Sequence, residues 1–234
     1  MNFAERISKL FVTPDNVFAG IKKDPDYNGL IFTIAISFPF VIVSSLIFSD
    51  KIKYNVSNLI PESIVTFIKL TTLVFTGFGF VYGIFITWIE LTFYVTILNK
   101  LLKKDYLFRE LLPATNYILI PLILNNIAEI YLFNSLSPIT IDITPGNNNS
   151  QSKIFEQGNK IYFNPVYIIV LILVFVITIY LLSSLISVYF EQDKIHSFIL
   201  SSGYIVFEIL RLLFAIIFIP LMFNLASSLQ TVPS

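Results

Sequence analysis

The sequence predicts an all-α, polytopic membrane protein: a helical bundle with five transmembrane helices, preceded by short amphipathic surface helices. Hydrophobic residues make up 56% of the 234 residues and charged residues only 13%, whereas soluble domains average about 25% charged residues. Long apolar stretches carry almost no charge, and the only charged residues in 64–102 are Lys69, Glu90 and Lys100. A helix rises ~1.5 Å per residue, so ~20 apolar residues cross ~30 Å of hydrocarbon. Several stretches of this chain are long enough to do so.

The composition also excludes several classes of function. A formal net charge of zero leaves no basic stripe for nucleic acid. The absence of cysteine excludes disulfides, thiol nucleophiles and Cys-ligated metals, and a single histidine, His196, argues against a His-based metal site. We therefore expect no cofactor and no metal, and the motifs of hydrolases, phosphate-binding loops and membrane proteases are missing. The chain is expected not to be an enzyme.

Residues 1–27 predict an amphipathic segment on the cytosolic membrane surface. Apolar residues recur at helical spacing, with Glu5, Arg6 and Lys9 on the other side of the helix. Thr13 followed by Pro14 is a typical helix start. We expect six apolar side chains to be buried at the membrane surface: Phe3, Ile7, Leu10, Phe11, Phe18 and Ile21. A frayed terminus is the alternative. Asp24-Pro25-Asp26 is interpreted as a turn, the alternative being two carboxylates that hold a divalent cation.

Five apolar stretches predict a membrane domain over residues 28–227, followed by a short external tail, 228–234. The approximate spans are 28–49, 64–102, 111–133, 164–190 and 197–225. The second is nearly twice the required length, so it either projects beyond the bilayer or bends near Gly77, Gly79 and Gly83. An alternation of apolar and polar residues over 139–144 suggests a short hairpin strand.

The distribution of basic residues predicts the orientation in the cell membrane. With the N-terminus cytosolic and the C-terminus external, nine Lys and Arg residues fall in cytosolic segments and four in external ones, leaving Lys69 and Arg211 within spans. Two N-x-S/T glycosylation acceptors, Asn55 and Asn148, both fall in the external loops. Both observations favour the same orientation.

Ionisable residues within spans are functional candidates, because each costs at least ~2.5 kcal/mol at the bilayer centre unless it is satisfied. The intramembrane polar cluster comprises Lys69, Glu90, Glu129, Glu208 and Arg211. One interpretation is a polar path for protons or a substrate. The other, which we favour, is a set of interhelical ion pairs that fix helix register, since opposite charges lie at matching depths. These depths predict the pairs Glu90–Arg211 and Lys69–Glu129, with Glu208 also within reach of Arg211.

The order of these features resembles the Yip domain family of integral membrane proteins, named for interaction with Ypt/Rab GTPases, and specifically its prokaryotic branch. A surface segment with a proline (FVTPDNVFAGIKKDPDY) precedes the first span, and a basic turn leads into LLKKDYLFRELLPATNYILIP. Relatives often have Gly-Tyr-x-x-x-Pro there, which Tyr117 and Pro121 match, with Asn116 in place of Gly. The acidic Asp-Leu-Tyr-Gly-Pro-type motif of the eukaryotic members does not occur before the first span.

Two functional hypotheses follow. The resemblance implies a non-enzymatic membrane scaffold or adaptor that contacts the lipid bilayer and a protein partner at the cytosolic face, for membrane organisation or trafficking-like recruitment. The alternative is a small transporter or channel lined by the intramembrane polar cluster. The sequence gives no oligomeric state.

Overall fold

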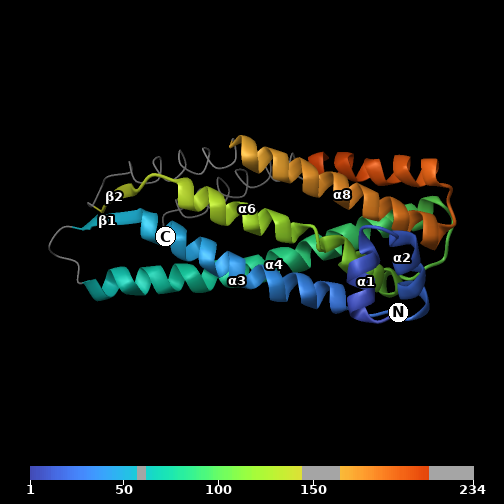
Figure 1. Ribbon diagram of the computed structural model, residues 1–234, viewed down its shortest axis with the longest axis horizontal. Coiled ribbons are helices and arrows are strands. Elements are labelled where there is room, and N and C mark those ends of the chain that lie inside the picture. The colour runs from blue at the N-terminus through green and yellow to red at the C-terminus, as the bar shows by residue number, and fades with distance from the viewer. Residues whose placement is uncertain (57–61, 144–163, 211–234) are drawn as a thin grey trace, which may run out of the picture.

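The computed structural model describes residues 1–56, 62–143 and 164–210, and these form a bundle of long helices that lie along one axis (Figure 1). Helices α1 (Phe3–Leu10) and α2 (Pro14–Lys23) lie across one end, which we call the N-terminal end. Strands β1 (Ile52–Val56) and β2 (Ile139–Ile143) lie at the opposite end, which we call the sheet end. The all-α fold class predicted from composition is confirmed, with this small sheet as an addition.

Four segments of the described chain are long and apolar enough to cross a membrane. They are α3 (Asn28–Lys51), most of α4 (Glu62–Leu101), the broken segment Phe108–Ser135 and α8 (Pro165–Phe190). Residues 194–210 are also helical, but the rest of the predicted fifth span lies outside the described residues. The polytopic bundle is therefore observed, and the count of five spans stays a prediction.

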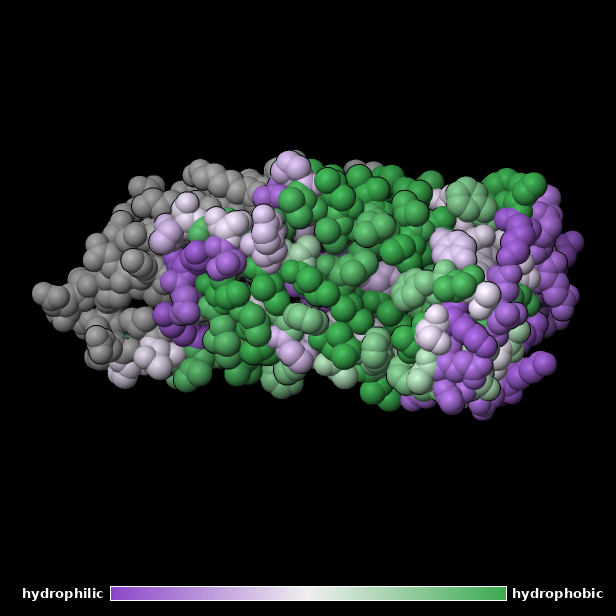
Figure 2. Space-filling model, viewed as in Figure 1, coloured by the Kyte–Doolittle hydropathy of each residue, from purple (hydrophilic) through white to green (hydrophobic). Residues whose placement is uncertain are grey.

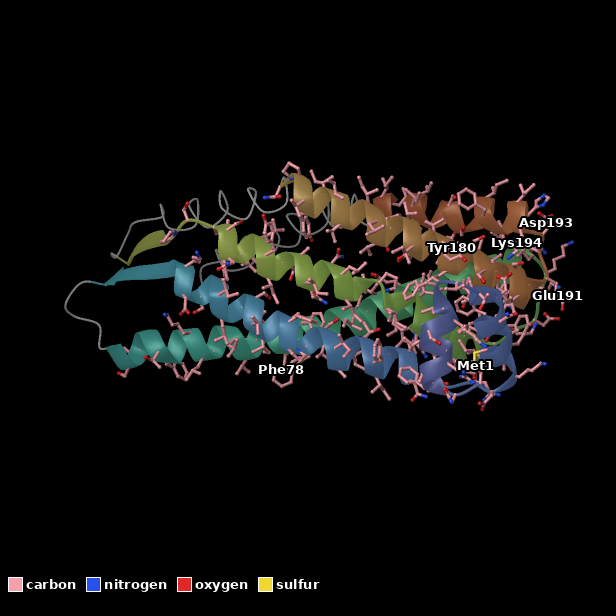
Figure 3. All side chains as sticks on the ribbon, viewed as in Figure 1. Met1, Phe78, Tyr180, Glu191, Asp193 and Lys194 are labelled. Atoms are coloured by element: carbon pink, nitrogen blue, oxygen red, sulfur yellow. The ribbon has the colours of Figure 1, made fainter. Side chains whose placement is uncertain are left out.

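The middle of the bundle carries a band of apolar side chains, while hydrophilic residues gather at the N-terminal end (Figure 2). Large apolar side chains project outward from the long helices, including Phe75 at 70%, Phe78 at 73% and Ile169 at 64% exposure (Phe78 is labelled in Figure 3). A soluble monomer rarely exposes so extensive an apolar surface. The band is the surface expected to contact lipid.

The second span is one unbroken helix of 40 residues, so its three glycines do not end it. The third span is broken, unlike the single stretch 111–133 that the sequence suggested. It consists of α5 (Phe108–Thr115), the 3-10 helix η1 (Asn116–Leu119) and α6 (Leu122–Ser135). Pro121 has no N–H to donate to the carbonyl of Tyr117, which instead accepts from the N–H of Ile120 at 3.4 Å. The proline thus explains the break.

Residues 139–143 form a strand as the alternation suggested, but the hairpin is wrong. β2 pairs in parallel with β1, in the register Ile52 with Ile139. Helices α3 and α6 pack against each other and run in the same direction, toward the sheet end (Figure 1). The strands that continue them therefore emerge side by side and parallel.

The apolar faces of α1 and α2 pack into the protein's own core. Leu10, Phe18 and Ile21 have no exposed surface, whereas Phe11 is 45% exposed. Most of this packing is against α8 and α5. The expectation that Leu10, Phe18 and Ile21 lie against lipid is therefore corrected. The broken third span and the end of α8 provide an apolar surface that the sequence pattern did not reveal.

Phe3 and Ile7 are partly buried against the same core. Their contact with the membrane surface, and that of Phe11, stay predictions. Two helices that sequence spacing predicted do form, but they are docked on protein.

The close approach of α3 to η1 at Gly29 yields a stability prediction. A Cβ at Gly29 would lie 2.3 Å from Oδ1 of Asn116 and 3.1 Å from the Cα of Tyr117. Gly29→Ala should therefore destabilise the protein by about 1–3 kcal/mol, the usual cost of overpacking. Thermal unfolding in detergent measures the effect. Gly79→Ala is the matched control, because a Cβ there meets nothing within 4 Å. Equal unfolding temperatures for the two variants would contradict the close approach.

Candidate functional site

The N-terminal end is built around Arg6, a residue of α1 that is only 1% exposed. Its guanidinium donates to the Asp26 carboxylate, to the Asp24 carbonyl at 3.0 Å and to the Asp24 carboxylate at 3.1 Å. The amphipathic pattern placed Arg6 on the solvent side of its helix. Burying a guanidinium is costly unless its charge is paired, and the two aspartates pair the charge and bind both terminal nitrogens, whereas Nε makes no hydrogen bond within the described residues.

Asp26 joins this pair to the membrane helices. Its Oδ1 accepts from the Tyr117 hydroxyl at 2.7 Å and from the N–H of Asn28 at 2.9 Å. Its carbonyl accepts from Nδ2 of Asn116 at 2.9 Å. One aspartate therefore fixes α1, the first turn of α3 and the 3-10 helix relative to one another. We call these groups the Arg6–Asp26 network.

The Asp24-Pro25-Asp26 segment is thus a turn, and its two carboxylates bind a guanidinium. Groups of three or more His, Cys, Asp or Glu that could hold a metal ion do not occur within residues 1–56, 62–143 and 164–210.

Lys22, in the last turn of α2, connects the N-terminal segment to the end of α8. Its ammonium donates to the carbonyls of Val188 and Tyr189 at 3.3 and 3.4 Å. It also lies 5.2 Å from the ring centroid of Tyr106 and 5.6 Å from that of Tyr189. The last carbonyls of a helix lack intrahelical donors, so a cation stabilises that end.

A second contact ties α2 to the connection after α8. The Asp15 carboxylate accepts from the Ser184 hydroxyl and from the Lys194 ammonium. Partial burial raises the pKa of this carboxyl, but the hydrogen bonds from Lys194 and Ser184 and the charge of Lys194 outweigh burial, so the net pKa lies below its usual range. Lys194 and its neighbours Glu191 and Asp193 lie at the N-terminal end (Figure 3).

The connection between α4 and α5 completes this end of the molecule. The Asn99 side-chain amide makes two hydrogen bonds to the backbone of Tyr106. Its Nδ2 donates to the Tyr106 carbonyl at 2.7 Å, and its Oδ1 accepts from the Tyr106 N–H at 3.4 Å. Lys104 forms an ion pair with Glu191 at 3.2 Å, and the hydrogen bond and charge of Lys104 lower the pKa of Glu191. Lys103 and Glu191 have positive φ angles of 54° and 57°, which allow the two sharp reversals.

Together, α1, α2 and residues 102–107 and 191–196 form the surface that we call the N-terminal platform. Its exposed side chains include the charged groups of two ion pairs, Glu5–Lys9 and Lys104–Glu191, and also the apolar Val12, Leu107 and Ile195. Such an arrangement is suited to docking a partner or a headgroup.

The intramembrane polar cluster is distributed over separate places. Lys69 and Glu129 line one cavity of about 280 Å³ with Asp50, and within the described part of the chain no ion pair joins the Lys69 and Glu129 side chains. Glu208 lines another cavity, of about 310 Å³, beside Asn125. Glu90 lies on α4. Arg211 lies outside the described residues, so its pairing with Glu90 or Glu208 stays a prediction.

The proposed acceptor Asn55 lies within β1, and Asn148 lies outside the described residues. The tail 228–234 lies outside them as well. Glycosylation therefore stays a prediction.

Sequence reasoning missed the residues that organise this end: Arg6, Asp26, Lys22 and Asp15. Tyr117 carried a signal, because it matches the Tyr of the family pattern. Arg6 carried none, since a basic residue among Glu5 and Lys9 is typical of an exposed helix face. Only the fold reveals that α1 turns this face toward Asp26.

Breaking the Arg6–Asp26 network should release the N-terminal segment. Arg6→Met leaves the Asp26 carboxylate partly buried without its cation, and breaking such a pair costs about 3–5 kcal/mol. Arg6→Met with Asp26→Asn should recover part of the loss. Protease cleavage within residues 1–27, measured in membranes, reports the release. Lys9→Met is the control, because Lys9 pairs with Glu5 at an exposed site, where pairs contribute ~0–1 kcal/mol. Equal protease sensitivity of Arg6→Met and Lys9→Met would contradict the network's role.

Comparison with known proteins places these features in a family. The family model described as the Yip1 domain matches residues 8–219, which include α2, the turn at Asp26, all the described membrane-spanning helices and the Asn116-Tyr117 pair. No curated protein and no solved structure matches the chain significantly. The family model covers most of the sequence, and this integral membrane protein belongs to the Yip1 domain family.

Proposed function

We propose that this protein is a non-enzymatic membrane scaffold or adaptor that recruits a protein partner to its N-terminal platform. The observation that carries the proposal is the Arg6–Asp26 network, which fixes α1 to α3 and the 3-10 helix at the end of a membrane bundle. A partner that binds this surface does not have to order it first. Pre-organisation lowers the entropic cost of association, which is ~0.5–1.5 kcal/mol for each immobilised side chain.

The proposal assigns the platform to the cytosol, with the protein in the cell membrane. The position of the basic residues supports this orientation, because cytosolic segments of membrane proteins are enriched in Lys and Arg. Arg6, Lys22, Lys104, Arg109 and Lys194 come from segments far apart in sequence, and all belong to elements or connections at the N-terminal end. The fold thus gathers basic residues at the N-terminal end, and this end is the one that the count of Lys and Arg along the chain assigns to the cytosol.

Photo-crosslinking in intact cells tests the recruitment. A photoreactive residue at Ser8, Lys23 or Asp105, all exposed on the platform, should give a discrete protein adduct. The same residue at Asn134, exposed near the sheet end, is the control. The platform adduct should decrease at least several-fold in Arg6→Met and persist in Lys9→Met, with each variant present in membranes at comparable amounts. The same adduct from Asn134, or one insensitive to Arg6→Met, would exclude a platform-specific partner.

A small transporter or channel is the second candidate function. Its support is the pair of cavities beside intramembrane charges, one next to Lys69 and Glu129 and one next to Glu208. Among the described residues the two cavities share no lining residue, which favours local polar sites over a single path.

Proton or cation flux into proteoliposomes distinguishes the two functions. The scaffold proposal expects the purified protein to give no more flux than protein-free vesicles, under an applied membrane potential and with an internal pH-sensitive dye. Flux that is present in the natural protein and lost in Glu129→Gln or Glu208→Gln would favour the transporter. Asn134→Ala, at the surface, controls for reconstitution.

A further inference from the structure

A cavity of about 560 Å³ opens at the N-terminal end, between α2, the start of α5 and the end of α8. Two cations, Lys22 and Arg109, line it together with three aromatic hydroxyl residues, Tyr27, Tyr106 and Tyr189. The segments that supply these groups are far apart in sequence. The fold therefore gathers positive charge and hydroxyl donors around one cavity.

The charge balance of the cavity wall favours an anion. Glu110 is the only carboxylate among the described residues that line it, and the Glu110 Oε2 accepts from the N–H of Leu107 at 2.8 Å, which caps α5. Arg109 is exposed and has no ion pair within residues 1–56, 62–143 and 164–210. Lys22 donates only to neutral carbonyls, at 3.3 and 3.4 Å. The described wall therefore carries two cations and one carboxylate, and the charge of Lys22 also acts on nearby Glu191, which pairs with Lys104.

The tyrosines add donors that the protein itself does not use. Tyr189 is 2% exposed, and within the described part of the chain neither its hydroxyl nor that of Tyr106 makes a hydrogen bond. Arginine, lysine and hydroxyl donors around one space are the groups that recognise a phosphate.

The position of the cavity points to a lipid as the source of that phosphate. Tyr27, on the cavity wall, packs edge-on against Trp88 with ring centroids 5.9 Å apart, and Trp88 Nε1 donates to the carbonyl of Leu112 at 3.1 Å. Tryptophan and tyrosine side chains concentrate at the level of lipid headgroups. The N-terminal end is also where the apolar band gives way to hydrophilic residues (Figure 2).

We infer that this cavity binds the phosphate of an anionic phospholipid headgroup. Arg109 and Lys22 supply the charge, and Tyr106 and Tyr189 supply hydroxyl donors. The bound headgroup would bridge α2, α5 and α8. The inference does not depend on the recruitment of a protein partner.

Native mass spectrometry of the full-length protein in detergent tests the inference, with phosphatidylglycerol as the probe and phosphatidylcholine of the same chain length as the comparison. Phosphatidylglycerol should bind more tightly than phosphatidylcholine. Arg109→Gln should weaken its binding by about tenfold, because a charge-assisted contact to phosphate is lost. Tyr189→Phe, which removes only the hydroxyl, should weaken it by a smaller factor.

Lys23→Gln is the matched control, since Lys23 carries the same charge next to Lys22, is exposed and does not line the cavity. Equal losses in Arg109→Gln and Lys23→Gln would mean diffuse electrostatic attraction and would overturn the site. Equal binding of the two lipids would overturn it as well. Displacement of phosphatidylglycerol by an equal concentration of inorganic phosphate would assign the cavity to a soluble anion and overturn the lipid assignment.

Discussion

The arrangement of the N-terminal end depends on one carboxylate. Asp26 binds the buried Arg6 guanidinium, accepts from the Tyr117 hydroxyl and closes the first turn of α3 through Asn28. Each partner belongs to a different element, so the geometry of one constrains the others. In a membrane the hydrophobic effect contributes little to the association of one helix with another. Directional polar contacts therefore contribute more to fixing the positions of the helices. Here such contacts lie at the N-terminal end of the bundle, around the buried Arg6 and the partly buried Asp26.

Composition and hydropathy were sufficient to predict the membrane class, because uncharged runs such as those of α3 and α8 have no stable soluble alternative. The helix start at Thr13-Pro14 was also predictable, because proline fits the first helical position, although the Thr13 side chain makes no capping hydrogen bond. The break at Pro121 was harder to predict. Proline is tolerated inside many membrane helices, and only the packing of η1 against α3 shows why this one interrupts the span.

The candidate site was mostly hidden from sequence reasoning. The helical spacing of apolar residues identifies the apolar face of α1, but it does not predict which residues contact the polar face. Arg6 was assigned to solvent because charged residues are seldom buried, and its burial depends on Asp26, twenty residues away in sequence, and on Tyr117, ninety-one residues beyond Asp26. The family's preference for Gly at position 116 offers one further comparison. In this chain Asn116 fills that place and donates to the Asp26 carbonyl, adding a contact that glycine lacks.

The docking of α2 on α8 has a consequence for biosynthesis. Asp15 meets Ser184 and Lys194 across 169 and 179 residues of sequence. At ~5–20 residues per second, the ribosome takes about 10–30 s to make the chain between them. During that interval the apolar side chains of α2, such as Phe18 and Ile21, have no α8 to cover them, and the bilayer surface is the nearest apolar phase. The α2 segment therefore gains its contacts with α8 only after the last of these residues has been made. An insertion error in α8 would leave that segment without those contacts.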